Sequence, residues 1–192
     1  NSHRASVEIT STFFVPKSAA EQLIEERENL VWHPERTAAR NEEEVAFTIV
    51  TILTLEEDAK GLKVAVTMDN TAKDHRLRAL FPVGVGNQHH YADSIFEIAK
   101  RPNVPEEQWK NPTFDHHMQR FVSLDEGEHG LTIAAKGLHE YEIVQNGTIA
   151  ITLLRAVGEL GDWGVFETPE AQCLGTNTAE FMVIPHKGNV LD

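Results

Sequence analysis

Two pairs of adjacent histidines are the residues of this chain best able to do chemistry. They are His89-His90 and His116-His117, and three carboxylates lie near them in sequence: Asp93, Glu97 and Asp115. Imidazole and carboxylate groups together are common zinc ligands. Adjacent residues of a strand point to opposite faces, however, so each pair can offer one histidine inward. No spacing here matches a metal motif, and we interpret the pairs as polar histidines rather than as metal ligands.

Acid–base chemistry is a second possibility for the same region. His90 and Glu97 could supply the acid and the base that a sugar epimerase needs on either side of a ring. Asp93 and Glu97 could instead act as the paired carboxylates of a glycosidase. The glycosidase pair is the weaker hypothesis, because carboxylates on strands are usually solvated.

Three arginines could line a polar site. Arg76 and Arg78 share one face of a predicted strand, and salt bridges to neighbouring carboxylates are their more frequent role. Arg120 follows a long loop and, in a predicted strand over 118–124, shares its face with Met118 and Val122. Its guanidinium must therefore leave the core or find a partner within a site.

Two tryptophans and one tripeptide have a structural and a functional interpretation each. Trp109 and Trp163 lie in predicted loops, where they could stack on sugar faces or pack over a sheet edge. Asn146-Gly147-Thr148 matches a glycosylation sequon. Because Asn-Gly is also a strong hairpin signal, the turn explains this tripeptide without a glycan.

Composition limits the class of protein. The 192 residues are 41% apolar and 24% charged, which is typical of a globular domain. The net charge of −13 argues against nucleic acid as a partner. No apolar run has the length of a membrane helix, so we expect no membrane partner and a cytoplasmic location. The single cysteine, Cys173, excludes an internal disulfide.

Alternating apolar and polar residues predict an all-β sandwich with one short helix near the N-terminus. The helix is predicted over 17–29, with Ser18 as its N-cap. The segment 45–55 is apolar on both faces, so we expect it to be covered on both sides. Long loops are predicted at 101–115 and 157–175. The predicted strands cover 6–15, 45–55, 62–69, 75–82, 92–100, 118–124, 131–135, 139–144, 148–154 and 178–184.

Six motifs in order carry a family resemblance: DHRLRALFP (74–82), YADSIFEIAKRP (91–102), GLHEYEIV (137–144), ITLLRAVGELGDWG (151–164), PEAQCLGTNTAEF (169–181) and VIPH (183–186). Together they resemble the C-terminal β domain of glycoside hydrolase family 38, in particular its bacterial α-mannosidases and mannosylglycerate hydrolases. The resemblance implies a galactose-mutarotase-like supersandwich of two packed, mainly antiparallel sheets. It also implies that residues 1–192 form one domain, the C-terminal fragment of a larger glycosidase.

The resemblance places the catalytic nucleophile and a zinc site in an N-terminal barrel that this chain does not contain. It therefore implies no catalytic residue, metal ligand or cofactor here, and a fragment that is inactive alone. The implied partners are the chain's own N-terminal catalytic domain and a mannoside, with homo-oligomers possible. By motif position, four residues are expected to reach the mannoside pocket: Arg120 foremost, then Gln119, His117 and His116. The alternative is a free-standing carbohydrate-binding or aldose-epimerase-like module.

Overall fold

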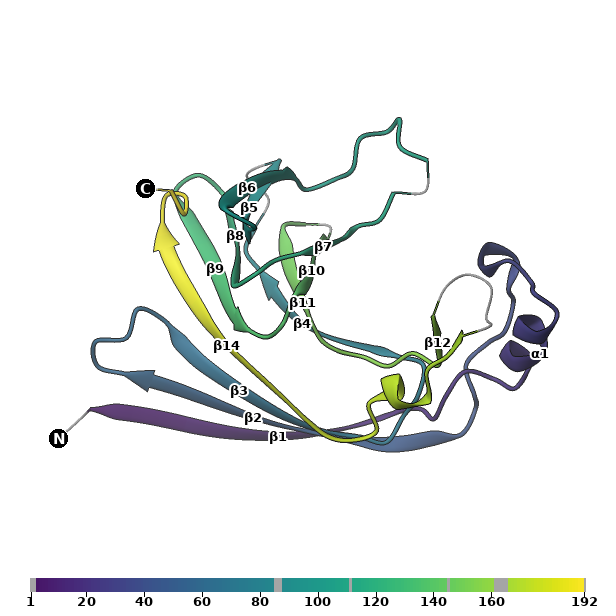
Figure 1. The fold of residues 1–192 in the computed structure, drawn as a ribbon. Coiled ribbons are helices and arrows are strands. Elements are labelled where there is room, and N and C mark those ends of the chain that lie inside the picture. The colour runs from purple at the N-terminus through teal and green to yellow at the C-terminus, as the bar shows by residue number, and fades with distance from the viewer. Residues whose placement is uncertain (1–2, 85–87, 111, 145, 161–165, 192) are drawn as a thin grey trace.

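The chain folds into two packed antiparallel sheets (Figure 1), described by a computed structural model for residues 3–84, 88–110, 112–144, 146–160 and 166–191. This confirms the predicted all-β sandwich. The large sheet has the order β1 (Arg4–Pro16), β2 (Glu44–Glu56), β3 (Leu62–Asn70), β14 (Gly175–Lys187), β9 (His129–Lys136), β8 (Phe121–Asp125), β5 (His89–Ser94) and β6 (Glu97–Pro102). The small sheet has the order β4 (Arg76–Pro82), β11 (Thr148–Arg155), β10 (Glu140–Val144) and β7 (Asp115–His117).

The remaining elements are short and lie beside the end of the sandwich where α1 (Gln22–Glu28) packs (Figure 1). They are η1 (His33–Glu35), η2 (Pro169–Gln172) and a two-stranded ribbon of β12 (Glu159–Leu160) and β13 (Phe166–Glu167). Helix α1 confirms the predicted helix, but it is shorter, and its N-cap is Glu21. Ser18 is not the cap, because its hydroxyl donates to the Ala19 carbonyl at 2.7 Å. No helix of the described residues is long and apolar enough to cross a membrane.

The core lies between the two sheets, and the alternation of β3 shows why. Val64, Val66 and Met68 are buried on the inner face, whereas Lys63 and Thr67 point outward. Strand β14 contributes Phe181 at the same level, because Phe181 is the ladder partner of Val64. Residues with a period of two thus place one face of each strand in the core.

Two predicted strands are wrong in extent because the chain turns where the sequence gives no turn signal. The segment 92–100 is not one strand but the hairpin of β5 and β6, in which Ser94 pairs with Glu97 across Ile95-Phe96. Phe96 has a φ of 65°, a left-handed conformation that Gly or Asn normally supplies. Neither Ile95 nor Phe96 is a residue type typical of turns, so the sequence gives no signal for a hairpin at this point.

The predicted strand over 118–124 is also wrong, because the chain crosses there from one sheet to the other. The Met118 amide donates to the His139 carbonyl at 2.9 Å, on the side of the small sheet. The next amide, of Gln119, donates to the Asp93 carbonyl of the large sheet at 2.9 Å. Strand β8 begins only at Phe121.

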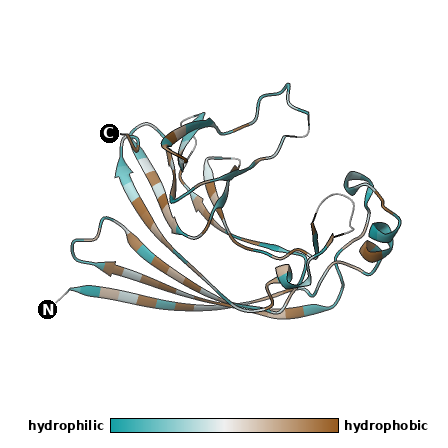
Figure 2. Cartoon of the chain, viewed as in Figure 1, coloured by the Kyte–Doolittle hydropathy of each residue, from teal (hydrophilic) through white to brown (hydrophobic). Residues whose placement is uncertain are grey.

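Strand β2 is not covered on both sides, contrary to its predicted environment. Phe47 and Thr54 are its buried residues, while Ile52 and Leu55 are exposed. Figure 1 shows β1 and β2 running along the open side of the sandwich, and Figure 2 shows hydrophobic residues along both strands. The small sheet has four strands against the eight of the large sheet, so it covers only part of the large sheet's inner face.

Candidate functional site

A buried polar cluster joins the two sheets where β5 and β6 lie against β7 and β10. His90 and Tyr141 are both fully buried. Nε2 of His90 lies 2.8 Å from the Tyr141 hydroxyl, and Nδ1 lies 2.9 Å from Oδ1 of Asn103. An amide oxygen only accepts, so Nδ1 of His90 donates to it and Nε2 accepts from Tyr141. These partners fix one tautomer of the His90 ring.

Arg101 and His116 complete the cluster from the sheet edges. Nη1 of Arg101 donates to the Tyr141 hydroxyl at 2.9 Å and to the His117 carbonyl at 2.6 Å. The His116 ring lies 5.5 Å from that of His90 and 5.6 Å from that of Tyr141. Arg101 therefore ties the edge strand of the large sheet to the edge strand of the small sheet.

Burial sets the charge of this cluster. It lowers the pKa of His90 to about 4. Burial also lowers the pKa of His116, with the Arg101 cation acting in the same direction. Burial raises the pKa of the Tyr141 hydroxyl. His90 is consequently neutral at pH 7, and the Arg101 guanidinium carries the positive charge of the cluster.

The structure does not assemble the metal or acid–base sites considered from sequence. Both ring nitrogens of His90 already have partners, and in the described part of the chain no three His, Cys, Asp or Glu side chains are grouped to hold a metal ion. His90 and Glu97 lie at opposite ends of their hairpin, since their ladder partners are Arg101 and Ser94. Asp93 pairs with Ile98, which places it on the face opposite Glu97.

A charged network covers the outer face of the small sheet and confirms the salt-bridge interpretation of Arg76 and Arg78. Arg76 contacts Asp115 at 2.6 Å and reaches Glu140 and Glu142 at 3.5 Å. Arg78 contacts Glu142 at 2.5 Å. Arg155 joins the same carboxylates, at 2.7 Å from Glu140 and 3.2 Å from Asp115. Three guanidinium groups and three carboxylates thus balance, and they tie together all four strands of the sheet.

A groove of about 860 Å³ lies beside both the cluster and the network. Asn103, which binds His90, and Glu142, which binds Arg78, are among its walls. His89 and Phe114 also line it. Its volume suits a small molecule, and a carboxylate, an amide and an aromatic ring are the groups that hold sugars by hydrogen bonds and stacking.

The four residues predicted to reach a mannoside pocket point in different directions. His116 points into the sandwich, and His117 lies exposed on the outer face of the small sheet. Gln119 is exposed at the crossing between the sheets. The Arg120 side chain is 84% exposed, lies 2.9 Å from Asp93 and borders a second groove of about 820 Å³ on the outer face of the large sheet. Within this chain they do not converge on one pocket.

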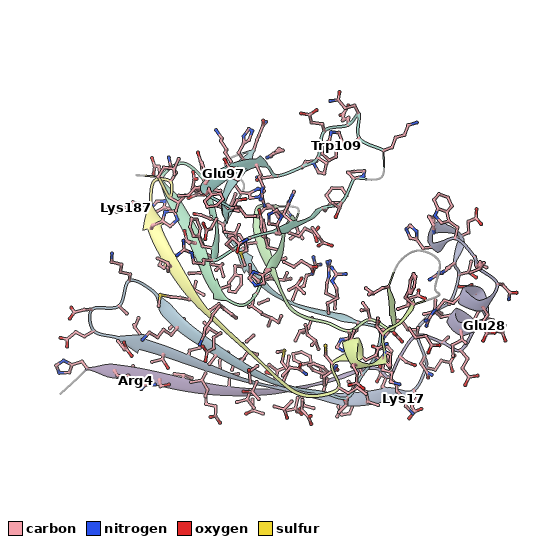
Figure 3. All side chains as sticks on the ribbon, viewed as in Figure 1. Arg4, Lys17, Glu28, Glu97, Trp109 and Lys187 are labelled. Carbon is pink, nitrogen blue, oxygen red and sulfur yellow. The ribbon has the colours of Figure 1, made fainter. Side chains whose placement is uncertain are left out.

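Other predicted residues are placed more simply. Arg120 leaves the core, whereas Met118 and Val122 are buried, because the crossing interrupts the alternation. Trp109 is exposed on the loop between β6 and β7, which Figure 3 shows projecting from the sandwich. Trp163 lies outside the described residues. Asn146 and Gly147 have φ values of 67° and 65°, which confirms their hairpin turn.

The sequence interpretation missed Tyr141, Arg101 and Asn103. Alternation along the predicted strand over 139–144 places Tyr141 on the same face as Ile143, and this face points inward. No local signal indicates that Arg101 and Asn103 reach across to it from another sheet.

Comparison with known proteins decides the family. Residues 11–159 match the model of the glycosyl hydrolases family 38 C-terminal domain. The chain belongs to this family. A protein of Halalkalibacterium halodurans named "Putative mannosylglycerate hydrolase" is 65% identical over 191 residues, which are 100% of this chain and 21% of that protein.

Two solved structures of similar proteins support this family assignment. An alpha-mannosidase from Enterococcus faecalis V583 superposes with a TM-score of 0.92 at 44% identity, over 96% of this chain and 21% of its own. A second family 38 protein from Enterococcus faecalis gives a TM-score of 0.89 at 43% identity, with the same coverage of both chains. The chain thus spans about a fifth of the length of these relatives.

Proposed function

We propose that this domain serves a retaining, zinc-dependent α-mannosidase as its C-terminal β domain. In the whole enzyme it braces the catalytic domain, and the segment 116–120 lines part of the mannoside pocket. The nucleophile that forms the glycosyl-enzyme intermediate of a retaining enzyme belongs to the catalytic domain. The described residues of this chain do not fit a zinc site, so the zinc would be held elsewhere in the enzyme.

One observation carries this proposal. The alpha-mannosidase of Enterococcus faecalis contains a domain of the same fold at 44% identity, and this chain corresponds to 21% of that protein. A chain that matches a fifth of an enzyme over 96% of its own length has the size of one domain of it. The exposed guanidinium of Arg120 and the exposed imidazole of His117 are available to a neighbouring domain.

The test compares the full-length polypeptide with the 192-residue chain on an aryl α-mannoside. We expect the full-length protein to turn the substrate over and the purified chain to show no turnover above buffer. Adding the remainder of the enzyme as a separate polypeptide should restore activity. Turnover by the chain alone, or a full-length protein with no α-mannosidase activity, would contradict the proposal. Sugar binding or anomer interconversion by the chain alone would favour a free-standing module.

A further inference from the structure

Strand β7 is held only weakly by its own backbone. It is the edge strand of the small sheet, it has three residues, and β10 is its ladder partner. The chain before it is the long loop after β6, which projects from the sandwich (Figure 3). A short edge strand opens easily, because few hydrogen bonds close it. Side chains must therefore help to fix the start of the segment 116–120, where β7 contributes His116 and His117.

The hydroxyl of Tyr141 connects β7 to the interior of the sandwich. It donates to Nε2 of His90 at 2.8 Å and accepts from Nη1 of Arg101 at 2.9 Å. The same Nη1 of Arg101 donates to the His117 carbonyl at 2.6 Å. These hydrogen bonds run from β5 through β10 and β6 to the backbone of β7, and we call them the Tyr141 relay.

The ring of Tyr141 holds the other histidine of β7. Tyr141 and His116 are opposite each other in the ladder of β10 and β7, so their side chains share a face. Their ring centroids lie 5.6 Å apart, and the ring planes are tilted by 34°. Tyr141 thus reaches His116 by packing and, through Arg101, the carbonyl of His117 by hydrogen bonds.

The far end of the segment has anchors of its own. Met118 is buried in the core, and its amide donates to the His139 carbonyl at 2.9 Å. The Gln119 amide donates to the Asp93 carbonyl at 2.9 Å. Core packing and backbone bonds therefore fix residues 118 and 119, whereas residues 116 and 117 have a short ladder and the Tyr141 relay.

We propose that Tyr141 is a positioning residue of the parent enzyme, which holds His116 and His117 in the place that they need at the mannoside pocket. The inference rests on the proposed function, in which the segment 116–120 lines part of that pocket. Tyr141 is fully buried, so it acts through Arg101 and His116 rather than by touching the sugar. A displacement of about 1 Å at a pocket wall can cost about 100-fold in rate, so a buried hydroxyl remote from the sugar can control turnover.

Tyr141→Phe in the full-length enzyme tests the proposal, because it deletes the hydroxyl and keeps the ring. We expect kcat/KM for an aryl α-mannoside to fall about 10- to 100-fold at a temperature well below the Tm of the variant. The matched control is Tyr91→Phe, at the other of the two tyrosines. Among the described residues the Tyr91 hydroxyl has no hydrogen-bond partner, so this variant should keep the activity of the unsubstituted enzyme.

A double-mutant cycle tests whether Tyr141 acts through Arg101. Arg101→Met keeps most of the side-chain length and removes the guanidinium that joins Tyr141 to the His117 carbonyl. If both residues belong to one relay, Tyr141→Phe should lower kcat/KM little further in an Arg101→Met enzyme. Additive losses in the double variant would overturn the inference.

Hydrogen exchange of the same full-length proteins shows whether the effect is local. In Tyr141→Phe, the β7 amides that bond to β10 should exchange about 10-fold faster, because β7 opens more often. The amides of the central strand β14 should exchange as in the unsubstituted enzyme, and Tyr91→Phe should change neither set. A residue that only stabilised the fold would change both strands alike and leave kcat/KM unaltered below the Tm.

Three other results would overturn the inference. They are an unchanged kcat/KM in Tyr141→Phe, an unchanged exchange of β7, and faster exchange throughout the domain. Each leaves the α-mannosidase activity of the unsubstituted enzyme, and with it the proposed function, in place. An unsubstituted full-length enzyme that does not cleave the mannoside would defeat the proposed function, and this inference with it.

Discussion

The imidazole ring of His90 lies 5.5 Å from that of His116, although the two histidines belong to different sheets. Tyr141 contacts both rings and Arg101 holds the Tyr141 hydroxyl. The sandwich is thus joined on this side by a buried polar cluster rather than by aliphatic packing. Such clusters depend on complete hydrogen bonding, and this one depends on a neutral His90.

The first prediction concerns pH. The pKa of His90 is about 4 in the folded chain and about 6.5 when unfolded, so the unfolded state binds an additional proton between these values. The free energy of unfolding should be highest above about pH 6.5, fall as the pH drops, and level off below about pH 4. The total loss from this residue should be about 3 kcal/mol. Urea unfolding of the 192-residue chain at several pH values measures it.

The control for the pH prediction compares slopes rather than absolute stabilities. His90→Gln should flatten the dependence of the unfolding free energy on pH, whereas His89→Gln, at an exposed position, should leave it unchanged. A residual slope is expected, because burial also lowers the pKa of His116 and of His75. Equal slopes in the unsubstituted chain and in His90→Gln would show that His90 does not titrate on unfolding.

Arg120 should affect catalysis more than folding in the full-length enzyme. We expect Arg120→Ala to lower kcat/KM by the equivalent of about 2–4 kcal/mol, as for the loss of one preorganised donor. Its ion-pair partner Asp93 has a side chain that is only 11% exposed, so Arg120→Ala should also lower stability, by about 1–2 kcal/mol, less than the catalytic loss. Lys17→Ala removes an ion pair with Glu43 in which both side chains are more than half exposed, and it should change neither quantity appreciably. A lower Tm with unchanged kinetics would remove Arg120 from the pocket.

Zinc should not bind stoichiometrically to the 192-residue chain. In the described residues, the inward histidines lie at the interface of the two sheets, where His90 is saturated by Asn103 and Tyr141. Elemental analysis after dialysis is expected to give well under one zinc per chain, while the full-length enzyme retains it. One tightly held zinc per chain would contradict this prediction.

The backbone conformation of Phe96 should make the folded chain less stable than it would be with Gly at this position. It is fully exposed and has a φ of 65°, a backbone conformation that is strained for residues other than Gly, Asn or Asp. Phe96→Gly should therefore raise the unfolding free energy by roughly 1 kcal/mol. Ile95→Gly, at the neighbouring exposed position of the same turn, should lower it by about 0.5–1 kcal/mol. A destabilised Phe96→Gly would show that the ring is packed.

Gly130 should not tolerate a side chain, because a Cβ there would lie 2.2 Å from the ring of His186. His186 is held in place by Thr132 at 3.1 Å and Ser123 at 3.2 Å. Gly130→Ala should lower stability by about 1–3 kcal/mol through overpacking. In the double variant with His186→Ala the cost should largely disappear, and additive effects of the two substitutions would contradict the steric explanation.

The sequence by itself determined the features that repeat every two residues along a strand. Alternation placed Val64, Val66 and Met68 in the core, and it gave one inward histidine per pair, as the burial of His90 beside the exposed His89 shows. Asn146-Gly147 marked its turn, since both residues readily adopt positive φ. These are local properties of the backbone, so they can be predicted from a single stretch of chain.

Tertiary structure decided which inward residues meet. The chain crosses between the sheets at 118–120, and this crossing sends Arg120 outward while His116 stays beside His90. Strand β2 was expected to be covered because it is apolar on both faces, but coverage depends on how far the small sheet extends. Crossings and sheet widths are set by long-range pairing, and hydrophobic periodicity within one strand carries no information about them.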